Sequence, residues 1–270
     1  MKFSYLFYRI IRVPKRIAKE MAKISPSLKG IYYKLFSKRK NIKGNIILLP
    51  PHPGDISEGE IEKFISNLDY EECMWDIGAH VGSVSIRLQY KFNKILAFEP
   101  HPENFSFLQE SISLNKINNI KAVSYAVGNV DGDITMNVQP LAGSQIGSLA
   151  EDSRLTDKII VECKKIDSLV KEFPTPDIVK IDVEGAEYKV IHGAKDTLEN
   201  KNIDWIIEVH VPETQSRIDR MSQHGDDYIK LHSLLSEKKY KIYGIRDGKL
   251  IEFDIRDGVI PLFWYATKAY

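Results

Sequence analysis

From about residue 72 onward, short apolar segments alternate with longer amphipathic ones, and this alternation constrains the fold more than any other feature of the chain. Short continuous apolar runs are typical of strands buried on both faces of a sheet, and apolar residues spaced three or four apart predict helices. When strands and helices alternate along a chain, the strands form a mostly parallel sheet with helices on both faces. The pattern therefore predicts an α/β fold with a doubly wound sheet.

The elements of this sheet can be assigned in chain order. We expect strands at Cys73–Ile77, Lys94–Phe98, Ile120–Val127, Ile178–Ile181 and Ile203–Val209, and helices at Ser83–Tyr90, Pro102–Asn115 and Tyr188–Leu198. The C-terminal segments Tyr240–Ile245, Leu250–Phe253 and Ile260–Thr267 have antiparallel character. Asp247 and Gly248 form a dipeptide that is typical of a two-residue hairpin turn.

The segment between Gly128 and Pro176 departs from the alternation. Strands are expected at Ile134–Val138 and Ile159–Cys163, outside the main sheet. Between them, residues 142–149 are rich in glycine and serine. Such a loop either closes over a substrate as a lid or is an exposed hairpin loop, and the composition fits both.

Charge is distributed unevenly along the chain. Residues 1–43 contain 13 Lys and Arg and one acid, a net charge of +12, whereas the remainder has 25 bases and 36 acids, a net charge of −11. We therefore divide the chain into a basic N-terminal arm at residues 1–45 and one domain at residues 46–270. Helical spacing of apolar residues from Ile17 to Leu35, interleaved with aromatic residues, predicts an amphipathic arm.

Two interpretations of the arm remain open. Residues 1–43 either bind an anionic membrane surface, or pack on the domain with a solvated basic face. No motif of a nucleic-acid-binding module is present, so we expect no nucleic acid partner. We find no apolar segment long enough to span a membrane. The two cysteines, Cys73 and Cys163, suggest no disulfide framework, so we expect a cytoplasmic protein, with the inner face of the membrane as an additional peripheral location.

A glycine-containing bend follows the first predicted strand, in the sequence Asp76-Ile-Gly-Ala-His-Val-Gly82. Ligands of open parallel sheets bind beyond the carboxyl ends of the strands, where this bend falls. Gly78 and Gly82 allow a tight turn and a close approach to a ligand. The carboxylate of Asp76 supplies an acceptor for an amine or a water molecule. The glycine spacing differs from the dinucleotide fingerprint, which would need glycine at His80 and Ser83.

Glu99 lies 23 residues after Asp76, at the expected end of the next strand. An acidic residue about 20 positions beyond the glycine bend accepts hydrogen bonds from both hydroxyls of a ribose. The bend and Glu99 together therefore indicate a nucleoside cofactor that carries an amino-acid group rather than a pyrophosphate.

These segments resemble the signature blocks of the FkbM family of S-adenosylmethionine-dependent methyltransferases. The blocks are Asp76–Gly82, Phe98-Glu-Pro100 with Asn104, and Lys180-Ile-Asp-Val-Glu-Gly-Ala-Glu187. The resemblance covers about residues 72–210. It implies a Rossmann-like fold with a seven-stranded sheet, S-adenosylmethionine as cofactor and, usually, O-methylation of a sugar or another small-molecule hydroxyl. It also carries over Asp76, Gly78, Gly82 and Glu99 as cofactor contacts.

We extend the expected cofactor site to the neighbours of these residues. The additional contacts are Ala79, His80, Pro100, Asn104, Ala126 and Asp182. His80 replaces the asparagine that is more frequent in the family, so we expect its backbone to matter rather than its side chain.

A second acidic cluster is expected at the ends of the later strands. Asp182 and Glu184 share one side of the chain under strand alternation, and Glu187 falls in the first turn of a helix, where an acid is favoured. Glu208 and His210 are two residues apart on the next strand end. Methyl transfer to a hydroxyl needs a base, so we expect the catalytic residues to be His210, Glu208 and Glu184. The alternative role of His210 is to shape the pocket.

Two other functions remain as alternatives to an O-methyltransferase acting on a sugar, glycolipid or related metabolite. One is a nicotinamide-dependent oxidoreductase, which the missing pyrophosphate glycines disfavour. The other is a non-catalytic membrane-associated scaffold. The carboxylates could also bind a magnesium or calcium ion, but we expect a reaction without a metal.

Overall fold

The computed structural model describes residues 37–42, 44–49, 59–138, 147–148, 157–200, 202–209, 227–257 and 260–268. The helical part of the predicted arm, most of the predicted lid and His210 lie outside these residues.

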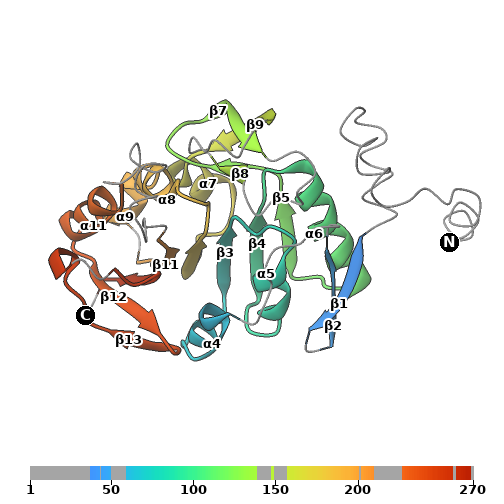
Figure 1. The fold of residues 1–270 in the computed structure, drawn as a ribbon, viewed down its shortest axis with the longest axis horizontal. Helices are drawn as coiled ribbons and strands as arrows, with labels where there is room; N and C mark the ends of the chain where they lie inside the picture. The colour runs from blue at the N-terminus through green and yellow to red at the C-terminus, as the bar shows by residue number, and fades with distance from the viewer. Residues whose placement is uncertain are drawn as a thin grey trace, which may run out of the picture.

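A large, mostly parallel sheet forms the centre of the fold (Figure 1). Its strand order is β13-β12-β14-β11-β10-β3-β4-β5. The strands are β3 (Cys73–Ile77), β4 (Lys94–Phe98), β5 (Ile120–Val123), β10 (Ile178–Ile181), β11 (Asp204–Glu208), β12 (Lys241–Arg246), β13 (Lys249–Ile251) and β14 (Phe263–Thr267). The five strands from β11 to β5 are mutually parallel, and β14 pairs antiparallel with β11. This arrangement confirms the predicted α/β fold with its antiparallel C-terminal strand.

The sheet has eight strands rather than the expected seven. The additional strand is β13, which forms an antiparallel hairpin with β12 through Asp247 and Gly248. Both turn residues have positive φ, 53° and 71°, as a type I′ turn requires. The hairpin turn was predicted correctly, and the count was wrong because this hairpin adds an edge strand.

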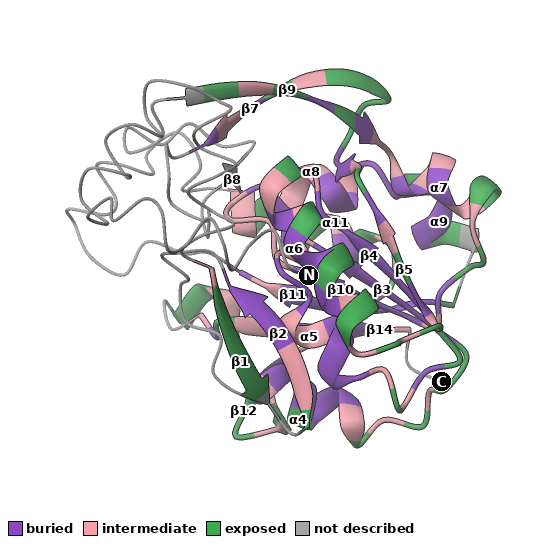
Figure 2. Cartoon of the chain, turned by 90° about the vertical axis from the view of Figure 1, so that its right-hand side faces the viewer, coloured by how far each residue is buried: buried purple, intermediate pink, exposed green. Residues whose placement is uncertain are grey.

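Helices cover both faces of the sheet. The helices α4 (Glu60–Ser66), α5 (Ser83–Arg87) and α6 (Pro102–Leu114) pack with strand β2 (Asn45–Leu49) on one face. The helices α7 (Ile166–Glu172), α8 (Glu187–His192), α9 (Lys195–Asn200) and α11 (Asp227–Glu237) pack on the other. Figure 2 shows the central strands buried between these layers. Strands covered on both faces need apolar residues at successive positions, which is why β3 and β4 read as continuous apolar runs.

The predicted strand Ile120–Val127 is divided between two sheets. Its first part is β5, and Ala126–Val127 forms β6, which pairs with β9 (Asp157–Lys164) of a smaller sheet. That sheet also contains β7 (Gly132–Val138) and β8 (Gly147–Ser148) and lies above the main sheet in the view of Figure 1. The single-strand prediction was wrong because β4 ends at Phe98, which pairs with Val123, so later residues have no partner in the main sheet.

The predicted helix Tyr188–Leu198 is also divided in two, here by a tertiary contact. Helix α8 ends at His192, and α9 begins at Lys195. Gly193 between them lies so close to the backbone carbonyl of Gly128 that a Cβ atom there would collide with it. The break therefore depends on packing against a segment about 65 positions earlier, which local spacing does not reveal.

The last described part of the basic segment is a strand. Here β1 (Lys38–Ile42) pairs antiparallel with β2. Strand β2 is attached to helix α6, because the N–H of Leu48 donates to Oγ of Ser111 and that of Ile46 to Oδ1 of Asn115. No helix within the described ranges has the length and apolar character to cross a membrane.

Candidate functional site

The glycine bend connects the end of β3 to helix α5, as predicted. Gly78 and Gly82 have φ of 80° and 84°, values that other residues rarely adopt. A Cβ atom on Gly78 would collide with the carbonyl oxygen of Asp182, so glycine lets the bend lie directly against the end of β10. The N–H groups of Gly78 and Ala79 both donate to the carbonyl of Phe98, at 3.0 and 2.9 Å, which fixes the bend to the end of β4.

Glu99 lies immediately beyond β4, and its carboxylate is held by the backbone on both sides. Oε2 accepts a hydrogen bond of 2.8 Å from the N–H of His80, and Oε1 accepts one of 2.9 Å from the N–H of His101. The side-chain amide of Asn104 lies 3.4 Å from Oε1. The glycine bend and Glu99, which the spacing of the sequence links, are thus in direct contact through the backbone N–H of His80.

His80 adopts φ of 53°. Asparagine and histidine are among the few non-glycine residues enriched in this left-handed region, which explains how histidine takes the place of asparagine in the bend. Burial, with further contributions from His101 and Lys180, outweighs the opposing charge of Asp182 and lowers the pKa of His80 to about 4. The imidazole is therefore neutral at pH 7.

Burial also shifts the titration of Glu99, which is 5% exposed. Burial raises the pKa of Glu99 to about 7, against the hydrogen bonds from His101, His80 and Asn104 and the charge of Lys180. The carboxylate is therefore close to its titration midpoint at neutral pH.

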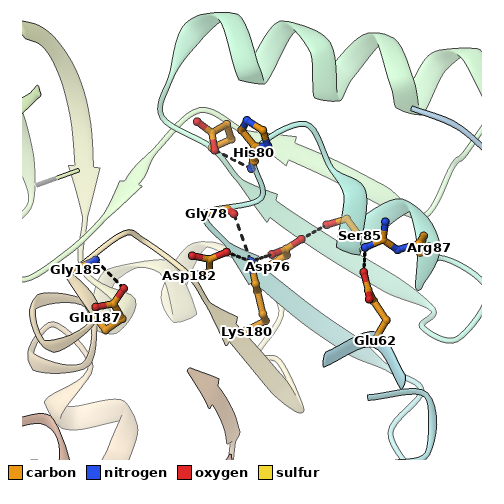
Figure 3. Close-up of polar contacts among 11 residues, drawn as sticks. Glu62, Asp76, Gly78, His80, Ser85, Arg87, Lys180, Asp182, Gly185 and Glu187 are labelled. Carbon is orange, nitrogen blue, oxygen red and sulfur yellow. Dashed lines mark hydrogen bonds and ion pairs between the residues drawn. The ribbon is translucent and has the colours of Figure 1, made fainter. Parts of the chain in front are cut away.

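Asp76 is fully buried, and its two oxygens contact different groups. Oδ2 accepts a 2.6 Å hydrogen bond from Oγ of Ser85, and Oδ1 lies 3.3 Å from Nζ of Lys180 (Figure 3). Next to Ser85, Arg87 forms a buried ion pair with Glu62 of α4. The structure thus places Asp76 beneath the bend, where it joins β3, α5 and β10.

Lys180 is the centre of a second group of contacts. Its ammonium lies 3.3 Å from Oδ2 of Asp182 and 3.4 Å from the carbonyl oxygen of Gly78, in addition to Asp76. Burial opposes the charged form of this lysine, but Asp182, Asp76 and Glu208 outweigh it and raise its pKa above the ordinary value. Lys180 therefore stays charged inside the protein.

The predicted acidic cluster lies around the ends of β10 and β11. Glu184 has φ of 54° in the turn after β10, and the side chain of Glu187 accepts a 2.9 Å hydrogen bond from the N–H of Gly185. This bond closes the turn at the start of α8, which gives Glu187 a structural role. Glu208 is the last residue of β11, half-buried, and interacts electrostatically with Lys180.

The other predicted site residues do not lie together in one part of the fold. Ala126 packs in the apolar cluster of the small sheet, and Pro100 lies half-buried directly after Glu99. His210 is outside the described residues, so its catalytic role stays a prediction. Within the described ranges, no group of three His, Cys, Asp or Glu side chains is arranged to hold a metal ion.

Comparison with known proteins identifies the family. The model of the methyltransferase FkbM domain matches residues 76–242, which include the bend, Glu99 and the acidic cluster. The chain belongs to the FkbM methyltransferase family. Membership in this family points to S-adenosylmethionine as the methyl donor and favours a methyltransferase over the nicotinamide-dependent alternative.

The individual proteins that match the chain share limited sequence identity with it. The hexuronic acid methyltransferase AglP of Haloferax volcanii is 29% identical over 150 residues, 56% of this chain and 61% of that protein. Methyltransferase 1 of Beauveria bassiana is 26% identical over 143 residues, 45% of this chain and 57% of that protein. The chain thus spans about three-fifths of the length of these relatives. The crystal structure of methyltransferase FkbM from Methylobacillus flagellatus KT aligns with a TM-score of 0.47 at 15% identity, over 96% of this chain and 56% of that one.

Three residues that contact the candidate site were not predicted from the sequence. These are Lys180, Ser85 and His101, which bind Asp76 or Glu99. A signal was present for Lys180, since it is the only charged residue in the strand Ile178–Ile181. A charged residue in a buried strand must be paired, which indicates nearby carboxylates.

Proposed function

We propose that this protein is an S-adenosylmethionine-dependent O-methyltransferase that acts on a hydroxyl of a sugar, glycolipid or related small metabolite. The observation that carries the proposal is the environment of Glu99, a buried carboxylate at a strand end, joined to the glycine bend through the N–H of His80. Family membership supports the methyltransferase activity. The hexuronic acid methyltransferase among the relatives supports a sugar acceptor.

The residues present fit this cofactor. A carboxylate offers about four acceptor positions. Oε2 of Glu99 receives one hydrogen bond from the described residues, so it has capacity for a ribose hydroxyl. The buried Nε2 of His80 has no hydrogen-bond partner among the described residues, which provides a further polar atom beside Glu99. When bound, the cofactor would supply the methyl group.

The acceptor hydroxyl must lose its proton, and a residue of the acidic cluster would accept that proton as the general base. We propose His210, Glu208 and Glu184 as the catalytic residues, with His210 as the preferred base because an ordinary imidazole pKa lies near neutral pH. The described chain before His210 is anchored as far as Val209, whose N–H donates a 2.7 Å hydrogen bond to the carbonyl of Leu262. A mechanism of this kind needs no metal, and excess EDTA should leave turnover intact.

A methyl-transfer assay tests the proposal. The full chain is incubated with S-adenosylmethionine labelled in the methyl group and with hexuronic acids, neutral sugars, glycolipids and amines as separate acceptors. We expect label in a methyl ether of a sugar hydroxyl, located by mass spectrometry. Glu99→Gln should abolish most turnover, whereas Lys171→Met, at an exposed position of α7, should not. Transfer to amines alone would contradict O-methylation, and cofactor binding without any transfer would favour a scaffold.

We also propose that residues 1–43 bring the protein to an anionic membrane surface, because their net charge of +12 is opposite in sign to that of anionic lipid head groups. A lipid-linked acceptor would then share the membrane surface with the protein.

A further inference from the structure

Lys180 is a buried cation in the apolar strand β10, and it is 6% exposed. Its strand neighbours Val179 and Ile181 are fully buried and apolar. In the parallel register, Lys180 lies beside Asp76 of β3 on one side and Ile206 of β11 on the other. Because side chains alternate along a strand, Asp182 and Glu208 lie two positions further along the same face.

The contacts of Lys180 connect the two halves of the site. Toward β3 its ammonium meets Asp76 at 3.3 Å and the carbonyl of Gly78 at 3.4 Å, and toward the end of its own strand it meets Asp182 at 3.3 Å. Gly78 is part of the bend assigned to the cofactor, and Asp182 begins the acidic cluster. Figure 3 shows the ammonium between these groups.

We propose that Lys180 is a positioning residue for methyl transfer: its buried ammonium ties the cofactor bend, through Asp76 and the carbonyl of Gly78, to Asp182 at the acidic strand ends. The inference rests on the proposed function. It concerns a residue that does not itself reach the reacting atoms, since it is buried beneath the bend.

A contribution to folding stability does not by itself explain why Lys180, Asp76 and Asp182 form a charged cluster inside the protein. Burying charges is costly, and apolar residues of similar volume often stabilise a fold as well or better. A lysine in this strand therefore suggests a role that needs its charge. Its contact with the carbonyl of Gly78 places that charge directly under the bend.

The effect on Glu99 follows from the groups that face it. These are the backbone N–H groups of His80 and His101, the amide of Asn104 on α6, and the charge of Lys180 on β10. Among these groups, Lys180 acts on Glu99 through its charge rather than through a hydrogen bond, and its contribution is smaller than that of the three hydrogen bonds. Without the lysine charge, Glu99 should bind its proton more tightly.

The decisive measurement is the titration of Glu99 in the full chain without cofactor. Glutamate carboxyl groups are labelled with carbon-13 and followed by NMR, and the Glu99 signal is identified by its loss in Glu99→Gln. We expect a midpoint near pH 7 in the wild type. In Lys180→Met the midpoint should rise above that of the wild type, because a positive charge favours the ionised carboxylate. Lys180→Arg, which keeps the charge, should titrate like the wild type.

Cofactor affinity gives a second readout. At pH 7, Lys180→Met should bind S-adenosylmethionine more weakly, by about fivefold for a midpoint one unit higher, and the loss should almost disappear at pH 9, where the carboxylate is ionised in both proteins. Because Lys180→Met leaves Asp76 buried without its cation, the double variant with Asp76→Asn is measured in parallel. Lys171→Met, which removes an exposed lysine of α7, is the matched control.

The outcomes separate the two hypotheses. If the wild type fails to bind S-adenosylmethionine, the proposed function is wrong, while the Glu99 titration still tests the role of Lys180. An unchanged midpoint in folded Lys180→Met, or a loss of affinity that is equal at all pH values, would overturn the inference. If neither neutral variant folds, Lys180→Gln, which keeps a hydrogen-bond donor but loses the charge, takes their place: a raised midpoint supports the charge role, and an unchanged midpoint contradicts it.

Discussion

The backbone N–H of His80 donates a 2.8 Å hydrogen bond to Oε2 of Glu99, and this bond joins the two segments that we propose bind the cofactor. The bend cannot move away from β4 without breaking it. The carboxylate is consequently oriented by the backbone of the same loop that would contact the cofactor. Preorganised acceptors reduce the entropic cost of binding.

We first predict that cofactor affinity depends on the ionisation of Glu99. Burial raises the pKa of Glu99 to about 7, and only the ionised form accepts two hydroxyl hydrogen bonds. Affinity should therefore be full above pH 8 and fall as the pH drops through 7, by up to about tenfold per pH unit. Calorimetric titration with S-adenosylmethionine from pH 5.5 to 9 measures this dependence.

Glu99→Gln is the control for this profile. It removes the titrating group, so affinity should be low at all pH values and any remaining slope reports titration of the ligand itself. A wild-type dissociation constant that stays constant from pH 5.5 to 9 would rule out the ribose role of Glu99.

Strands β3 and β4 were predicted to the residue, because parallel strands buried on both faces are continuous apolar runs with clear ends. The division of Ile120–Val127 and the break at Gly193 were not predicted, because they depend on where a partner strand ends and on which backbone lies nearby. Such information is absent from local spacing.

The site shows the same division between local and tertiary information. The spacing of Asp76 and Glu99 sufficed to predict that both lie at neighbouring strand ends. The role of Lys180 was missed because the lysine is isolated in sequence, and its partner Asp76 is about 100 positions away. Only the in-register pairing of β3 with β10 brings them together.

A second prediction concerns the opposite end of β11, where two tyrosines share one carboxylate. Oδ2 of Asp204 accepts a 2.6 Å hydrogen bond from Tyr70 and another from Tyr265. Burial and the hydrogen bond to Asp204 raise the pKa of Tyr70 to about 12 and that of Tyr265 further above its ordinary value. Unfolded tyrosines ionise near 10. This stabilisation is therefore complete below pH 10 and is lost as the pH rises through 10 to 12.

Urea unfolding at pH 8 and pH 10.5 tests this network. Tyr265→Phe should lower the free energy of unfolding by about 2 kcal/mol at pH 8, the range for a hydrogen bond to a charged group, and should weaken the alkaline loss. Tyr90→Phe alters a tyrosine that is 75% exposed and should change stability by less than about 0.5 kcal/mol. Equal effects of the two substitutions would contradict the buried network.

A third prediction concerns the basic segment. The full chain should float with vesicles containing anionic lipid at low salt and be released as the salt concentration rises, because the attraction is electrostatic. Deleting residues 1–36 should abolish flotation. The deletion ends before β1, since Lys38–Ile42 pairs with β2 and belongs to the folded part. Flotation of the shortened chain to the same extent as the full chain would exclude the segment as the membrane anchor.

The last prediction tests the close contact between the bend and β10. Gly78→Ala adds a Cβ atom that collides with the carbonyl oxygen of Asp182 at φ of 80°, so the bend must shift. Gly44→Ala is the control, because Gly44 has a similar φ of 86° but a Cβ atom there would meet no atom within 4 Å. This variant therefore measures only the cost of a positive φ in a non-glycine residue, about 1–2 kcal/mol. Gly78→Ala should therefore destabilise more than Gly44→Ala in urea unfolding. It should also weaken cofactor binding, which Gly44→Ala should leave unchanged. Equal losses of stability, with unchanged cofactor affinity in both variants, would show that the bend tolerates displacement from β10.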